Sequence, residues 1–181
     1  MTLEALALQG RSKTYSTLAA SVTTRIYELR KELIKESLGS SQTPEHQMEF
    51  VANIHGIEFI NDSRACNINS TWFALESVNH PVIWIAGGAD RGNDYSIIRE
   101  LVESKVKAII LLGNSQKILE AFSDIDIPII QATDMDEAVE TGYYLGETGD
   151  CMLLSPACAS FEMFENYEAR GIAFKKAVRK L

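Results

Sequence analysis

Several features that would point directly to a function are missing from this sequence. No apolar run reaches the roughly 18 residues of a membrane-spanning helix, and the N-terminus lacks a basic stretch followed by an apolar run and a cleavage site. The spacing of the three cysteines indicates no disulfide pair, and no histidine lies near them at metal-ligand spacing. We therefore expect a cytoplasmic protein with small buried thiols, no membrane partner and no metal site.

Positive charge is also scarce. The chain has 17 Lys and Arg against 25 Asp and Glu, a net charge of −8. Because a nucleic-acid backbone requires a basic face, we expect no nucleic-acid partner. The length of 181 residues, with 46% hydrophobic and 23% charged residues, suits one well-buried domain with an appendage.

The common nucleotide and nucleophile motifs are absent. No G-x-G-x-x-G follows an expected strand, and no G-x-x-x-x-G-K-[ST] loop occurs, so the chain alone should not hold a nucleoside triphosphate tightly. Ser155 lacks the G-x-S-x-G context, and no recognisable motif provides a histidine partner for Cys158. Both observations argue against nucleophilic catalysis. His46, His55 and His80 stand apart, and structural or surface roles are expected for them.

The first pattern along the chain is helical. Residues 14–38 carry apolar residues at three- and four-residue steps, with Arg, Lys and Glu between them. Gly, Ser and Pro within residues 39–44 favour an end to this helix and a domain boundary. Because an isolated helix is marginal in water, it either packs on the domain that follows or is the remnant of a missing one.

From residue 48 onward the chain predicts an α/β fold. Period-two runs around His55 and Gly56 predict a β-hairpin, and a helix is expected over residues 67–78. Further strands are expected at residues 82–86, 108–112, 128–130 and 152–154, and helices at residues 95–104, 115–122, 134–147 and 160–181. This alternation predicts a Rossmann-like, mostly parallel, doubly wound sheet of about six strands that includes the N-terminal hairpin and is preceded by a helix.

Three polar or glycine-rich loops fall at the carboxyl ends of these strands, at residues 62–67, 87–92 and 155–161. Ligands bind at that edge in such folds, so we expect the loops to converge. Ser160 is expected to cap the last helix, whose free N–H groups could hold a carboxylate or phosphate. On local residues alone, a tight turn with nothing bound is an equal alternative.

Single side chains in these segments also allow two interpretations. Arg64 and Arg91 could each clamp a carboxylate or phosphate through a bidentate fork, although a solvated surface arginine is the commoner case. Phe164 and Tyr167 are expected on the last helix, where a core role is the default.

Three motifs together are recognisable. NDSRACNINST at residues 61–71, GGADRG at residues 87–92 and LLSPACASFEMFENYEARG at residues 153–171 resemble, in the same order, the motifs of the Mur ligase family. The similarity is to those members that add D-glutamate. It implies that residues 41–181 form the C-terminal Mur ligase domain and that residues 1–40 are a helical remnant of the central ATPase domain.

The resemblance implies part of an enzyme of peptidoglycan synthesis. In this family's reaction, ATP phosphorylates the carboxylate of UDP-N-acetylmuramoyl-L-alanine, and the amine of D-glutamate attacks the acyl phosphate. The phosphate loop and Mg²⁺ belong to the central domain. We therefore expect D-glutamate as a partner, UDP-N-acetylmuramoyl-L-alanine through the missing domains, ATP and Mg²⁺ only in the complete enzyme, and no ligation by this chain alone.

The resemblance also implies individual site residues. Those expected at D-glutamate are Arg64, Cys66, Arg91, Ser160, Phe161 and Tyr167. Three positions depart from the family: Arg64 and Arg91 stand where it has Lys, which keeps the charge but changes the donor geometry. Cys66 stands where it has Thr, and a thiol donates a weaker hydrogen bond than a hydroxyl.

The expected nucleotide-binding residues are Gln47, Asp62 and Arg64. Asp62 falls at a ribose contact. Gln47 falls where the family has an Arg that meets ATP phosphates, so a positive charge is missing there. The family usually has His, Asn and Asn at Ser12, Lys13 and Ser16.

These departures keep a second reading open, a non-catalytic binding or regulatory module derived from a Mur ligase. A nucleotide-binding Rossmann protein is a third reading, which the absent glycine fingerprint disfavours.

Overall fold

The computed structural model describes residues 44–113 and 115–181, so the helix expected at residues 14–38 and the boundary expected at residues 40–41 lie outside the described part. The elements, in chain order, are β1 (Glu49–Ile54), β2 (Ile57–Asn61), α2 (Ile68–Ser77), β3 (Val82–Gly87), the 3₁₀ helix η1 (Tyr95–Ile98), α3 (Arg99–Lys105), β4 (Val106–Leu112), α4 (Gln116–Phe122), β5 (Ile129–Ala132), α5 (Met135–Leu145), β6 (Cys151–Leu154) and α6 (Tyr167–Val178).

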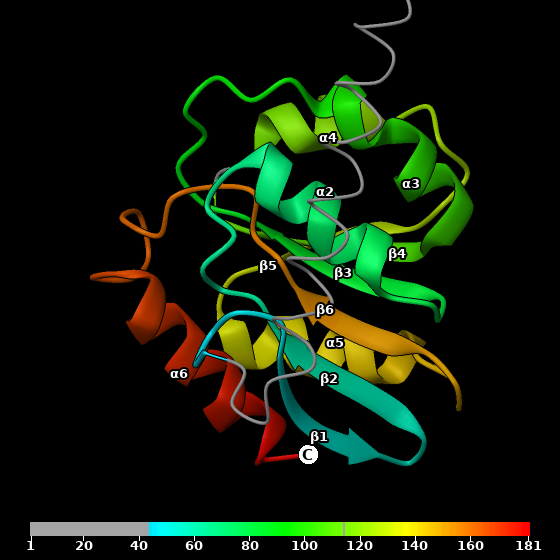
Figure 1. Ribbon diagram of the computed structural model, residues 1–181, viewed down its shortest axis with the longest axis vertical. Helices are drawn as coiled ribbons and strands as arrows, with labels where there is room; N and C mark the ends of the chain where they lie inside the picture. Colours follow the sequence, from blue (N-terminus) through cyan, green and yellow to red (C-terminus); the bar gives the residue numbers. More distant parts are fainter. Residues whose placement is uncertain (1–43, 114) are drawn as a thin grey trace, which may run out of the picture. The chain divides into compact units, whose positions relative to one another are not determined.

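The six strands form one sheet in the order β1-β2-β6-β3-β4-β5. All neighbouring pairs are parallel except β1 and β2, which form the expected antiparallel hairpin. Helices α2, α3 and α4 cover one face of the sheet, and α5 and α6 cover the other (Figure 1). The predicted α/β, mostly parallel, doubly wound sheet is therefore confirmed for the described residues.

Strand β3 shows why the sheet is covered on both sides. Its side chains alternate between the two layers: Trp84 packs in the core under α2 and α4, whereas Ile83 and Ile85 pack in the core under α5 and α6. All six residues of the strand are buried. A strand that is apolar on both faces is stable only between two layers of helices.

Two helical predictions need correction. The helix expected at residues 95–104 is divided, because the Asp94 side chain caps a short 3₁₀ turn through Ser96 N and α3 begins only at Arg99. The helix expected from Ser160 begins instead at Tyr167.

The start of α6 has a clear local cause. Asn166 is extended, with φ −156°, and its side chain accepts a hydrogen bond from Ala169 N at 2.7 Å. The carbonyl of Ser160 accepts from the N–H groups of Met163 and Phe164, which makes a single turn that goes no further. The expectation that the last helix begins at Ser160 is therefore wrong.

Candidate functional site

The three loops at the carboxyl edge of the sheet do converge. Ala89 and Ala159 exchange two backbone hydrogen bonds of 3.0 and 3.1 Å, which join the loop after β3 to the loop after β6. Asn93 Nδ2 donates to Ala157 O at 2.9 Å. The contact is close because residue 88 is glycine: a Cβ there would lie 2.4 Å from the carbonyl oxygen of Ala159, at a φ of +120°.

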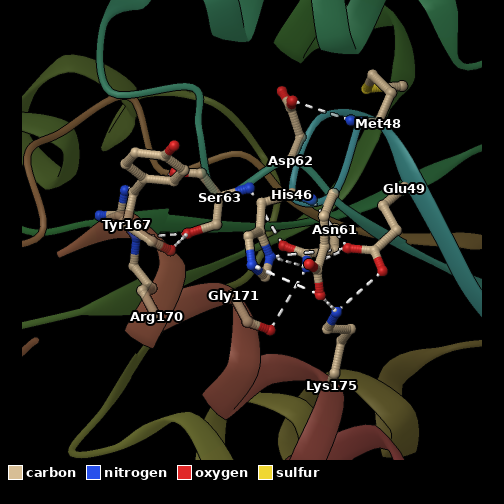
Figure 2. Close-up of polar contacts among 11 residues, drawn as sticks. His46, Met48, Glu49, Asn61, Asp62, Ser63, Tyr167, Arg170, Gly171 and Lys175 are labelled. Carbon is tan, nitrogen blue, oxygen red and sulfur yellow. Dashed lines mark hydrogen bonds and ion pairs between the residues drawn. The ribbon is translucent and has the colours of Figure 1, made fainter. Parts of the chain in front are cut away.

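Arg170, on α6, ties the loop after β2 to the loop after β6, and its role was not foreseen from the sequence. Its Nε donates to Ser63 Oγ at 3.1 Å, its Nη2 to Ser63 O at 2.8 Å and to Cys66 Sγ at 3.3 Å, and its Nη1 to Cys158 O at 3.0 Å. The side chain is only 1% exposed, and this burial lowers the pKa of its guanidinium. Figure 2 shows it beside Ser63 and Tyr167.

Arg170 is also unusual in its electrostatics. Its four acceptors are neutral, and within residues 44–113 and 115–181 no carboxylate forms an ion pair with it. A buried cation without a counter-ion is costly, and here four hydrogen bonds to neutral acceptors offset part of that cost. The only sequence signal for this role is its position one turn after the Asn166 cap, at a helix start that faces the strand ends.

Asp62 is the second buried charged group of the edge. Its carboxylate accepts from Met48 N at 3.1 Å (Figure 2) and from Ser155 Oγ at 3.2 Å. Burial raises the pKa of Asp62 to about 7, although these two hydrogen bonds act in the opposite direction. Ser155 Oγ also lies 3.1 Å from Thr71 Oγ1, so the group belongs to a buried polar chain.

Asp90 shapes the loop that carries Arg91. It accepts from Tyr95 OH at 2.5 Å, from Gly92 N at 2.5 Å and from Lys117 Nζ at 3.2 Å. Burial alone would raise the pKa of Asp90, but these hydrogen bonds outweigh it and lower the pKa to about 2. Asp90 is thus an ionised anchor of the loop.

The expected D-glutamate residues fall into two groups. Cys66 and the backbone of Tyr167 meet around Ser63, whose hydroxyl donates to Tyr167 O at 2.7 Å. Arg91 lies over the ring of Phe161, with 5.6 Å between Cζ and the ring centroid. Arg170 joins the first group to the loop that carries Phe161, because it binds both Ser63 and the carbonyl of Cys158.

Other expected positions have more ordinary surroundings. Arg64 is exposed, and its Nη1 donates to Gln47 Oε1 at 3.4 Å, so two of the expected nucleotide-binding side chains touch each other. Ser160 is buried. Tyr167 is the first residue of α6, whereas Phe164 lies in the preceding turn rather than on a helix, half-buried against the core under α5 and α6.

His46 has a structural role in this arrangement. It is buried, and its Nδ1 lies 2.9 Å from Asn61 Nδ2, which also donates to Glu49 Oε2 at 3.0 Å (Figure 2). The ring fits against Gly171, where a Cβ would lie 2.2 Å from Nδ1. No group of three His, Cys, Asp or Glu side chains able to hold a metal occurs among the described residues.

A cavity of about 300 Å³ opens beside the converging loops. It lies between the loop after β3 and the start of α4, and its lining includes Gly88, Asp90, Tyr95, Lys117, Cys158 and Glu162. Within the described part of the chain, no helix is long and apolar enough to cross a membrane.

Comparisons with known proteins point to one family. Residues 46–158 match the family model described as Mur ligase, glutamate ligase domain. Over 177 residues the chain is 49% identical to the UDP-N-acetylmuramoylalanine–D-glutamate ligase of Christiangramia forsetii, covering 97% of this chain and 40% of that protein. A protein of the same name from Bacteroides fragilis is 45% identical over 183 residues, covering 100% of this chain and 41% of its own length.

A solved structure is consistent with the fold. The MurF ligase from Thermotoga maritima, in complex with ADP, matches with a TM-score of 0.50 and 12% identity, over 82% of this chain and 36% of that one. This chain spans about 40% of the length of the curated relatives named above. The comparisons give no support to a non-catalytic regulatory module.

Proposed function

The chain belongs to the Mur ligase family, and from this premise we propose that it is the D-glutamate-binding, C-terminal part of an ATP-dependent ligase. The complete enzyme would add D-glutamate to UDP-N-acetylmuramoyl-L-alanine in peptidoglycan synthesis, as the names of the relatives describe for those proteins. Residues 41–181 would be the C-terminal domain and residues 1–40 a remnant of the central one. The proposed location is the cytoplasm, where ATP is available.

The observation that carries the proposal is the cationic edge of the sheet. Buried Arg170 joins the loop that carries Arg64 to the loop that carries Phe161, and its own acceptors are all neutral. Arg91 lies over the ring of Phe161. An amino acid with two carboxylates supplies the anions that such an edge lacks, and an arginine binds a carboxylate in a bidentate manner.

The proposed contacts follow the two groups of residues. Arg64 and Cys66 would meet one end of D-glutamate, together with the ring of Tyr167. Arg91 and Ser160 would meet the other end, next to Phe161. The task of these side chains is to hold the amine of D-glutamate where an activated carboxylate can be attacked, which is catalysis by positioning.

The nucleotide side depends on the rest of the enzyme. As the family resemblance implies, we assign a contact with the ribose to the position of Asp62. Gln47 and Arg64 would lie beside it. By the same resemblance, we assign Mg²⁺ and the phosphate contacts of ATP to the upstream domains, and we expect no ligation by this chain alone.

A chimaera tests this function. The part of the Christiangramia forsetii relative that matches this chain is replaced by this chain, and ADP release is followed with UDP-N-acetylmuramoyl-L-alanine present. We expect release that depends on D-glutamate, that L-glutamate does not replace, and that falls at least tenfold on Arg91→Met.

The control is the intact relative, with circular dichroism and thermal melting to show that the chimaera is folded. A folded chimaera that binds the upstream substrates but never turns over with D-glutamate would refute the proposed function.

A further inference from the structure

Phe161 and Arg91 form an exposed pair at the site. The guanidinium carbon of Arg91 lies 5.6 Å from the centroid of the Phe161 ring, within the roughly 6 Å over which a cation is attracted to an aromatic face. Phe161 is 66% exposed, so burial in the core does not account for its place in the chain. Its ring is instead placed against a cation.

Arg91 is otherwise uncommitted. Among residues 44–113 and 115–181, no carboxylate lies within ion-pair distance of it. The acid next to it in sequence, Asp90, is occupied by Tyr95, Gly92 and Lys117. The N–H edges of Arg91 are therefore open to a ligand.

The backbones that carry the pair are fixed on both sides. The loop of Arg91 is joined to the loop of Phe161 by the two hydrogen bonds between Ala89 and Ala159. Phe161 itself lies within a turn, in which the carbonyl of Ser160 accepts hydrogen bonds from the N–H groups of Met163 and Phe164. The ring and the guanidinium thus meet without ordering either loop.

A planar guanidinium gains from this arrangement. It can lie over an aromatic face while its in-plane N–H edges remain free for bidentate contact with a carboxylate. Holding a long side chain in place before the ligand arrives reduces the rotamer entropy lost on binding.

We propose that Phe161 is a positioning residue that acts through Arg91, holding the guanidinium so that its N–H edge faces a carboxylate of the amino acid. This inference rests on the proposed function, in which D-glutamate binds at this edge. It differs from the role that family resemblance implies for Phe161, which is direct contact with the ligand. The two roles can be told apart in one way: if Phe161 acts through Arg91, replacing Phe161 has no effect on ligand binding once Arg91 has been replaced.

A double-mutant cycle on the 181-residue chain tests the inference. The dissociation constant of D-glutamate is measured by NMR titration at millimolar ligand for the unaltered chain, Phe161→Leu, Arg91→Met and the double variant. We expect Phe161→Leu to weaken binding two- to fivefold in the presence of Arg91 and not at all in the Arg91→Met background.

A conservative variant and a direct signature complete the experiment. Phe161→Trp keeps an aromatic face, so it should bind D-glutamate as the unaltered chain does. The δ-proton signals of Arg91 should carry a ring-current shift with Phe or Trp at position 161 and lose it with Leu. The ring-current shift reports whether the ring and the guanidinium meet in solution, and the double-mutant cycle reports whether ligand binding depends on that contact.

The outcomes separate the inference from the proposed function. An equal loss from Phe161→Leu in both backgrounds would show direct ligand contact and overturn the inference, while leaving the proposed function intact. Unshifted Arg91 signals in the unaltered chain would overturn it as well. If D-glutamate does not bind even the unaltered chain, the seat in the proposed function fails, and the inference fails with it.

Discussion

Replacing Asp62 by Asn should remove a large pH dependence of stability. The pKa of Asp62 is about 7 in the folded chain because the carboxyl group is buried, against 3.8 for an ordinary aspartate. The folded state therefore holds a proton that the unfolded state has released between these two values. Stability is fully present below the lower pKa and is lost as pH rises through the upper one.

The size of the effect follows from the same two values. Between pH 5 and pH 8, a group with these pKa values costs the folded chain about 2.5 kcal/mol. The amide that Asp62→Asn introduces cannot titrate, yet its carbonyl can still accept from Met48 N, and its NH₂ can donate to Ser155 Oγ. Ser155 can in turn donate to Thr71 Oγ1, which lies 3.1 Å away.

The assay is urea denaturation of both proteins at pH 5, 6, 7 and 8. Taking the difference in unfolding free energy between the two proteins removes the contribution of the other titrating groups. This difference should shift by about 2.5 kcal/mol in favour of Asp62→Asn between pH 5 and pH 8. A difference that stays constant across this range would mean that Asp62 titrates normally, and the burial argument would be refuted.

Three further predictions concern the loops. Asn166→Ala should cost about 1 kcal/mol of unfolding free energy in urea melts, since it removes the cap of α6, and Ser160→Ala should cost less; the reverse order would contradict the observed helix start. Gly88→Ala should destabilise more than Gly92→Ala, because both have positive φ but only residue 88 would clash, and equal losses would speak against the close approach. Arg170→Met should lower stability by about 2 kcal/mol and broaden the amide signals of the loops it joins; unchanged loop signals would exclude its bridging role.

Strand patterns were the most predictable part of this chain. The β3 segment has no polar residue. Continuous apolar runs of this kind, separated by segments of helix length, favour a parallel sheet regardless of which apolar residues they contain. The β1–β2 hairpin was equally predictable, because two runs of alternating apolar and polar residues on either side of a glycine turn are typical of a hairpin. These features depend on local pattern alone.

The start of the last helix was not predictable from the cap residue. Ser160 and Asn166 are both good N-cap residues, so local preference does not choose between them. The burial of the following residues distinguishes the two positions. Arg170, Gly171 and Phe174 are buried at helical spacing counted from Tyr167. Periodicity further along the helix would have indicated the correct start.

The buried charges were also out of reach of sequence reasoning. Arg170 and Asp62 are charged residue types that are normally exposed, and only the convergence of three distant loops buries them. Family resemblance supplied Asp62 as a ligand contact but not its raised pKa. It gave no sign that Arg170 joins the loops.

The most direct test of the central claim is an NMR titration of the 181-residue chain with D-glutamate and, separately, with L-glutamate. We predict millimolar binding of D-glutamate, with the largest amide shifts at Ser160, Phe161 and the neighbours of Arg91, and clearly smaller shifts with L-glutamate. Equal shifts from the two enantiomers, or none from either, would contradict the assignment of a D-glutamate site to this edge of the sheet.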